Sequence, residues 1–297
     1  MSKTTVFTGT GVAIVTPMFS DGSVNYEKYR ELIEWQIENG TNAIIACGTT
    51  GESSTLNDDE HVDVIRIAVE QSKGRVPVIA GTGSNDTGYC LELSRKAKEL
   101  GSDALLIVTP YYNKTSQRGL IAHYTAIADD VRMPIILYNV PSRTGVDIKP
   151  ETYAKLGSNP YIVGIKEANG NINSVARTAA LCGDTLDIYS GNDDQIVPIL
   201  SLGGKGIISV MSNIIPAKTS EIAASWFRGD IKNSCKLQLE LMELISALFS
   251  DVNPIPVKEA MNLMGMDVGS CRLPLCDMDE QGRQALAAVL RRYGLSN

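Results

Sequence analysis

Short aliphatic and β-branched runs alternate along the chain with longer stretches in which apolar residues recur at helical spacing. Each run predicts a buried strand, and each ends in a turn rich in Gly, Ser, Thr or Asn. Continuous apolar strands separated by helices are typical of parallel sheets that are covered on both faces. The predicted strands cover residues 12–16, 43–47, 77–81, 104–109, 135–139, 162–166, 187–190 and 206–210.

The amphipathic stretches between these strands complete eight strand–helix units. Eight units within about 230 residues predict an α/β fold of the (β/α)8 TIM barrel type. An open, doubly wound sheet is the alternative, but the glycine fingerprint that such sheets often carry after the first strand is missing here. The predicted helices cover residues 26–39, 57–73, 87–100, 116–130, 150–157, 171–182, 193–202 and 216–228.

The last part of the chain contains helical patterns without strands. They cover residues 231–249, 257–264 and 279–293, and the segment Pro254-Ile255-Pro256 separates the first two. We therefore expect residues 1–228 to form a catalytic barrel. Residues 229–297 are expected to form a C-terminal helical region that packs on the barrel and is not an independent domain.

Composition narrows the class of protein. The 297 residues are 43% hydrophobic and 21% charged, and the net charge of −7 argues against a nucleic-acid partner, which requires a basic face. The apolar runs are too short to cross a membrane, and the first residues contain no apolar stretch that predicts an export signal. The six cysteines form no Cys-x-x-Cys pair, so we expect reduced thiols and a cytoplasmic protein.

Lys166 is the first candidate for chemistry, because it ends the strand predicted from the apolar run 162–165. Burial disfavours an ammonium group, so the pKa of this lysine should fall. A neutral lysine amine attacks carbonyl carbon and forms a Schiff base. The alternative is a strand-end lysine whose ammonium reaches water.

Other unusual side chains also follow predicted strands, and active sites of such barrels lie where the strands end. Tyr138 ends the strand beside that of Lys166, so its hydroxyl is a candidate acid–base group, or else a buried hydroxyl bonded to backbone. Thr49 and Thr50 lie between glycines in a turn that suits a small carboxylate or simply caps a helix. Arg143 suits a second carboxylate or a surface ion pair.

Metal and phosphate chemistry find little support in the sequence. The two histidines, His61 and His123, fall within predicted helices, where packing or surface roles are more common than catalysis. No ligand spacing for a metal is present, so the residues give no support for a metal mechanism. Asp193 and Asp194, after the seventh strand, would repel a phosphate and instead suit the N-terminal dipole of the following helix.

Four ordered segments give the chain a specific resemblance. They are Gly-Thr-Thr-Gly-Glu at 48–52, Thr-Pro-Tyr-Tyr-Asn at 109–113, Tyr-Asn-Val-Pro-Ser-Arg-Thr-Gly at 138–145 and Gly-Ile-Lys-Glu at 164–167. With these segments the chain resembles the 4-hydroxy-tetrahydrodipicolinate synthase family, formerly called dihydrodipicolinate synthase. The resemblance runs nearly end to end and includes 253–258 and 272–275 in the tail.

The resemblance implies an enzyme that condenses pyruvate with L-aspartate 4-semialdehyde on the route to diaminopimelate and lysine, without metal or organic cofactor. Lys166 would form the Schiff base with pyruvate, and Tyr138 would donate and accept protons. Thr49 would connect Tyr138 to Tyr112, which a neighbouring subunit would contribute. The family is typically a homotetramer built as a dimer of dimers.

The same resemblance implies a set of substrate-binding residues. Thr50 and the backbone of Ile208 would hold the pyruvate carboxylate, Gly191 would line the substrate site, and Arg143 would bind the semialdehyde carboxylate. Related pyruvate-releasing aldolases, such as N-acetylneuraminate lyase, share the lysine and tyrosine but generally lack this arginine. Such an aldolase is the alternative, and a non-catalytic barrel that binds a keto acid is a more distant one.

One departure from the family concerns regulation. In lysine-inhibited relatives, a histidine and a glutamate occupy the positions of Asp58 and Tyr89. Losing the glutamate removes the carboxylate that would neutralise the α-ammonium group of the effector. We therefore predict weak or absent feedback by lysine, although Asp58 offers a carboxylate that could compensate in part.

Overall fold

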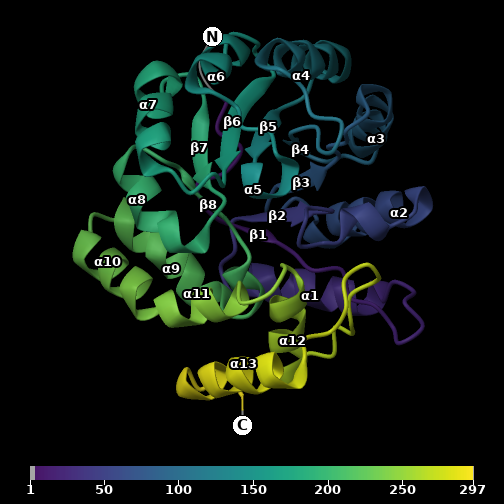
Figure 1. Cartoon of the computed structure of the whole chain (residues 1–297), viewed down its shortest axis with the longest axis vertical. Coiled ribbons are helices and arrows are strands. Elements are labelled where there is room, and N and C mark those ends of the chain that lie inside the picture. The colour runs from purple at the N-terminus through teal and green to yellow at the C-terminus, as the bar shows by residue number, and fades with distance from the viewer. Residues whose placement is uncertain (1–3, 297) are drawn as a thin grey trace.

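A closed barrel of eight parallel strands in sequential order forms the centre of the protein (Figure 1). The computed structural model describes residues 4–296. Residues 1–3, which begin the stretch that was searched for an export signal, lie outside the described residues. The prediction of a (β/α)8 barrel is confirmed. The strands are β1 (Gly9–Ala13), β2 (Ala43–Ala46), β3 (Val78–Gly81), β4 (Ala104–Val108), β5 (Ile135–Asn139), β6 (Ile162–Glu167), β7 (Asp187–Ser190) and β8 (Gly206–Ser209).

Helices surround the barrel and continue beyond it. The barrel helices are α1 (Tyr26–Glu38), α2 (Asp58–Ser72), α3 (Thr87–Glu99), α4 (Gln117–Val131), α5 (Pro141–Thr144), α6 (Pro150–Leu156), α7 (Ile172–Cys182), α8 (Ile196–Ser201) and α9 (Pro216–Phe227). Short 3₁₀ turns are η1 (Ser53–Thr55), η2 (Asp193–Gln195) and η3 (Met211–Asn213). The C-terminal helices are α10 (Ile231–Glu240), α11 (Met242–Leu248), α12 (Ile255–Leu263) and α13 (Glu280–Arg292).

The first strand was predicted too late in the chain. β1 covers Gly9–Ala13 instead of residues 12–16, because Gly9–Val12 pair with Gly206–Ser209 of β8 and close the barrel. The following residues remain buried although they leave the sheet. The apolar run at residues 12–16 therefore indicated buried residues correctly. The limits of the strand, however, follow from the pairing of β1 with β8, the last strand of the barrel.

Two predicted helices have different limits in the structure. The pattern 231–249 is divided at Leu241, and the helix expected from residue 257 begins at Ile255. Pro256 lies in the first turn of α12, where a missing N–H breaks no helical hydrogen bond. The prolines at 254–256 therefore mark the beginning of α12.

Two apolar layers hold the barrel together. The larger one lies between the strands and the surrounding helices, and a smaller one contains inward-facing residues such as Ile136, Tyr138 and Ile208. Near the amino ends of the strands, the rings of Phe7 and Tyr189 stack with centroids 4.4 Å apart, and the Tyr189 hydroxyl donates to the Phe7 carbonyl. Because the interior is filled at this end, the opposite end is left for a site.

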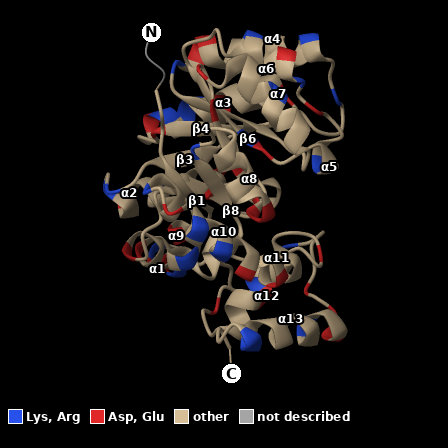
Figure 2. Ribbon diagram, turned by 90° about the vertical axis from the view of Figure 1, so that its left-hand side faces the viewer, with Lys and Arg blue, Asp and Glu red and all other residues tan. Residues whose placement is uncertain are grey.

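The C-terminal helices α11–α13 lie along the α1 and α9 side of the barrel, away from α4 and α6 (Figure 1). Basic and acidic residues are interspersed along the outer helices (Figure 2). Within residues 4–296, no helix has both the length and the apolar character needed to cross a membrane.

Candidate active site

The ends of β5 and β6 bring the two principal candidates together. Tyr138 and Lys166 are direct partners in the register of these strands, and both are nearly fully buried. The Lys166 Nζ atom lies 4.2 Å from the centre of the Tyr138 ring. A tyrosine and a lysine at this spacing can exchange a proton through a bound substrate.

Burial lowers the pKa of Lys166 from 10.5 to about 7. The negative charge of Asp193 raises the pKa of Lys166, and the positive charge of Arg143 lowers it. Each of these two effects is smaller than the effect of burial. Lys166 forms no ion pair with any residue in the range 4–296, whereas the other deeply buried lysine, Lys258, lies 2.8 Å from a carboxylate oxygen of Glu52. An unpaired buried amine is neutral part of the time near pH 7, as a nucleophile must be.

Burial raises the pKa of Tyr138, and a hydrogen bond with Thr49 opposes part of this effect. The neutral phenol is therefore the resting form, able to donate a proton and to receive it back. Thr49 is half-buried in the turn after β2, so the structure places the expected threonine beside the tyrosine.

The second threonine of this turn has a different partner. The Asn253 Nδ2 atom, from the segment before α12, donates to Thr50 Oγ1 at 3.1 Å. The main-chain carbonyl of Asn253 accepts from Arg143 Nη2, also at 3.1 Å. Thr50 is buried, whereas Arg143 is exposed on α5. Asn253 therefore contacts both side chains that are expected to bind carboxylates.

A cavity of about 420 Å³ opens beside these residues. Thr49, Arg143 and Asn253 line it, together with residues that follow β3 and β4. Several predicted site residues do not line it, so the expectation that the side chains after the strands share one site is only partly met; these residues are Thr50, Tyr138, Lys166, Gly191 and Ile208. The remaining lining residues are Glu52, Ser53, Ser54, Thr55, Leu56, His61, Gly83, Ser84, Tyr89, Leu93, Val108, Tyr111, Val140, Thr144, Pro274 and Leu275.

Gly191 directly follows β7, the strand next to that of the lysine, and Ile208 lies on β8, one strand further round the barrel. The Gly191 amide donates to the Glu167 carbonyl at 2.7 Å, and a Cβ atom at Gly191 would lie 2.7 Å from the Cβ of Ala168. Glycine is therefore required for the close approach of the segments after β6 and β7. Ile208 is fully buried in the interior of the barrel.

Glu167 is a buried acid whose role the residue pattern did not predict. Its carboxylate accepts hydrogen bonds from Tyr153, Asn139 and the amide of Asn169, and burial raises its pKa to about 7. The residue follows Lys166 on β6, while Asn139 follows Tyr138 on β5. The Glu167–Asn139 contact therefore joins the strand ends that carry the lysine and the tyrosine.

Asp193 differs from its predicted role. The sequence suggested that it serves the dipole of a following helix, but its carboxylate is buried and accepts from the Ser209 hydroxyl and from the amides of Val210 and Met211. It anchors the segment after β8, and the helix expected from residue 193 begins as a 3₁₀ turn. Its charge also acts on Lys166.

Tyr112 is not brought into the site of its own chain. Its side chain is 90% exposed, and its φ of +68° lies in the left-handed region, which is uncommon for a tyrosine. A strained residue at a loop tip that contacts little of its own chain is often explained by a function of the loop.

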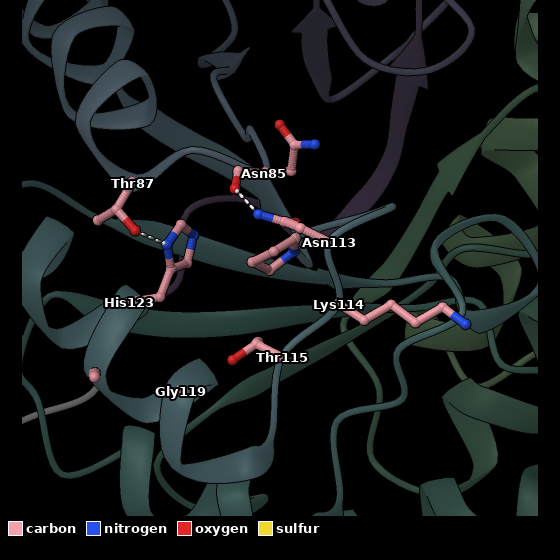
Figure 3. A pocket seen from close by; sticks show the side chains of 9 residues that line it. Asn85, Thr87, Asn113, Lys114, Thr115, Gly119 and His123 are labelled. Carbon is pink, nitrogen blue, oxygen red and sulfur yellow. Dashed lines mark hydrogen bonds between the residues drawn. The ribbon is translucent and has the colours of Figure 1, made fainter.

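A second cavity, of about 440 Å³, lies between α3, α4 and the loop after β4. Figure 3 shows His123 directed toward Thr87, to which its Nδ1 atom is hydrogen-bonded at 2.9 Å, while Asn113 bonds the carbonyl of Asn85. Lys114 extends away from these side chains (Figure 3). Burial lowers the pKa of His123 to about 4, so this histidine is neutral and serves packing.

The two residues that depart from the lysine-inhibited pattern contact each other. The Tyr89 hydroxyl donates to Asp58 Oδ1 at 2.5 Å, and burial together with this bond raises the pKa of Tyr89 to about 12. His61, a neighbour in this region, donates from Nε2 to the Gly81 carbonyl at 2.8 Å. The Asp58 carboxylate is thus already engaged by Tyr89.

The part of the chain that the structure describes contains no group of three or more His, Cys, Asp or Glu side chains placed to hold a metal ion. The expectation that no metal is used stays a prediction.

Comparison with known proteins identifies close relatives. Residues 6–293 match the model of the dihydrodipicolinate synthetase family. A 4-hydroxy-tetrahydrodipicolinate synthase of Acetivibrio thermocellus is 56% identical over 290 residues, 98% of each chain. The pyruvate complex of a chloride-inhibited dihydrodipicolinate synthase from Acinetobacter baumannii is 45% identical, with a TM-score of 0.96 over 98% of this chain and 100% of that one. A structure described as a monomeric dihydrodipicolinate synthase variant is 44% identical, with a TM-score of 0.94 and 98% of each chain covered.

Proposed function

The chain belongs to the dihydrodipicolinate synthetase family, and we propose on this premise that Lys166 is the residue through which it binds pyruvate. The protein is an enzyme, a lyase of the class I aldolase type. It condenses pyruvate with L-aspartate 4-semialdehyde to 4-hydroxy-tetrahydrodipicolinate in the biosynthesis of diaminopimelate and lysine.

The observation that carries the assignment of Lys166 is its buried, unpaired amine beside Tyr138. The neutral Nζ atom attacks the keto carbon of pyruvate, and loss of water gives a protonated imine. This iminium withdraws electrons, so the methyl group loses a proton and an enamine forms. The enamine carbon then adds to the aldehyde carbon of the semialdehyde.

Tyr138 is the group assigned to the proton transfers. Its phenol is neutral at rest, and Thr49 shares a hydrogen bond with it. Thr49 in turn connects the tyrosine to Tyr112 of a neighbouring subunit. The exposure of Tyr112 supports this assignment, because a relay through the same chain would require its side chain to turn inward.

Two carboxylate sites complete the proposal. Thr50 and the backbone of Ile208 hold the carboxylate of pyruvate, with Gly191 beside them. Arg143, which is exposed at the cavity that Thr49 also lines, binds the carboxylate of the semialdehyde as a bidentate partner. The arginine favours the synthase over a pyruvate-releasing aldolase.

Assembly and location belong to the same proposal. We assign a homotetramer, a dimer of dimers in which Tyr112 completes the site of its neighbour, and a cytoplasmic location. Size-exclusion chromatography with light scattering measures the assembly. Because one similar structure is described as a monomeric variant, a monomer with full activity would remove the assigned role of Tyr112.

Borohydride trapping tests the nucleophile. Pyruvate plus the reductant should add a stable mass to Lys166, and Lys166→Ala should abolish the addition. Lys258 is the internal control, since it is equally buried but ion-paired and should stay unmodified. Label on another lysine, or none, would refute the assignment.

The second substrate is tested separately by two activities. A coupled assay should detect condensation with L-aspartate 4-semialdehyde, and cleavage of N-acetylneuraminate should be undetectable. Cleavage of N-acetylneuraminate without condensation with the semialdehyde would instead assign the chain to the pyruvate-releasing aldolases.

A further inference from the structure

Asn253 connects the barrel mouth to the C-terminal helical region. It precedes α12, lies more than 200 residues after Thr50 in the chain, and is 6% exposed. Its side chain bonds Thr50 and its main-chain carbonyl bonds Arg143. No other residue in the range 4–296 has a described hydrogen bond to both side chains.

The hydrogen bonds of Asn253 differ from those of an asparagine with a purely structural role. Asn262, on α12 of the same region, uses both ends of its amide: Nδ2 donates to the Gly269 carbonyl and Oδ1 accepts from the Val268 amide. The Oδ1 atom of Asn253 is buried and has no hydrogen-bond partner among residues 4–296. A buried acceptor without a partner is costly, and such groups are often retained for function.

We propose that Asn253 is a positioning residue that sets the spacing of the two carboxylate sites, holding Thr50 through its side chain and Arg143 through its main-chain carbonyl. The inference rests on the proposed function of those two residues. The C-terminal region would thereby act on the selection of substrates as well as on the stability of the barrel.

The two contacts can be separated experimentally, because a substitution at Asn253 removes the side chain and leaves the carbonyl. In Asn253→Ala, Thr50 loses a hydrogen bond while Arg143 keeps its acceptor. We expect the KM for pyruvate to rise about tenfold, the effect of one lost hydrogen bond in a buried site. The KM for L-aspartate 4-semialdehyde should change less than about twofold, since no contact of Arg143 is removed.

Asn253→Asp provides a second variant that keeps the shape of the side chain. It replaces the donor with a negative oxygen beside a site for an anion, so the KM for pyruvate should rise by more than in Asn253→Ala. This variant carries the test if the alanine variant fails to fold, as judged by circular dichroism. Equal pyruvate KM values in the wild type and in the folded variants would overturn the proposal.

Asn262→Ala is the matched control. It loses two hydrogen bonds in the same region but none to the barrel mouth, so it should lower the melting temperature without changing the ratio of the two KM values. If Asn262→Ala changed the ratio of the two KM values as much as Asn253→Ala does, the proposal would be overturned. A general loosening of the C-terminal region would then explain the effects of both substitutions.

Borohydride trapping of the wild type distinguishes failure of this inference from failure of the proposed function. If pyruvate does not label wild-type Lys166, the proposed function fails. If the wild type is labelled and Asn253→Ala keeps the wild-type dependence on pyruvate concentration, only the role of Asn253 fails.

Discussion

The pH dependence of Schiff-base formation follows from the environment of Lys166. Burial in the barrel lowers its pKa from 10.5 to about 7, and only the neutral amine attacks pyruvate. Trapping should therefore increase as the pH rises through about 7 and become constant above about 8. This direction follows from the sign of the shift, because deprotonation creates the reactive form.

The size of the effect can be worked out from that pKa. With a pKa of about 7, about a tenth of the amine is neutral at pH 6, about half at pH 7 and about nine tenths at pH 8. An ordinary lysine would be neutral in only about one molecule in 3,000 at pH 7. At pH 7 the folded environment thus raises the concentration of neutral amine by roughly three powers of ten, which corresponds to about 4 kcal/mol.

Two neighbouring charges provide perturbations of opposite sign. Asp193 raises the pKa of Lys166, so Asp193→Asn should move the inflection to lower pH. Arg143 lowers that pKa, so Arg143→Gln should move the inflection to higher pH, and by less, because solvent screens an exposed guanidinium. Neither expectation involves the semialdehyde, since the assay uses pyruvate alone.

The assay is single-turnover trapping with borohydride, with the modified lysine quantified by mass spectrometry from pH 5.5 to about 9.5. The stability of the reductant over this range is controlled by trapping a small model amine in parallel. An inflection near 10 in the wild type, or shifts of the same sign in both variants, would refute the electrostatic account.

Three further expectations follow from the same structure. Arg143→Ala should raise the KM for the semialdehyde far more than that for pyruvate, and equal effects would contradict its assigned role. Lys258→Met leaves a buried carboxylate without its partner and should reduce the free energy of unfolding in urea by about 3–5 kcal/mol, whereas the exposed control Arg177→Ala should cost less than about 0.5 kcal/mol. L-Lysine should inhibit weakly or not at all, since Tyr89 already engages Asp58; strong inhibition in a titration would show otherwise.

Local patterns in the sequence predicted most of the barrel and singled out Lys166 and Tyr138 as candidates for chemistry. Strands β5 and β7 have the predicted limits, and most helices agree to within a residue at each end. Lys166 could be singled out because a charge that ends an apolar strand breaks the local pattern. Its partnership with Tyr138 followed from the rule that consecutive parallel strands lie side by side in a barrel.

Tertiary structure decided what the polar side chains contact. The residue pattern alone gave no reason to connect Asn253 with Thr50 or Lys258 with Glu52, because partners more than 200 residues apart share no local periodicity. Asp193 was assigned to a helix dipole from sequence, yet its carboxylate is enclosed by the segment after β8. Composition and periodicity report whether a side chain is polar or buried. Its hydrogen-bond partners are fixed only when the barrel closes and brings distant strand ends and the C-terminal region together.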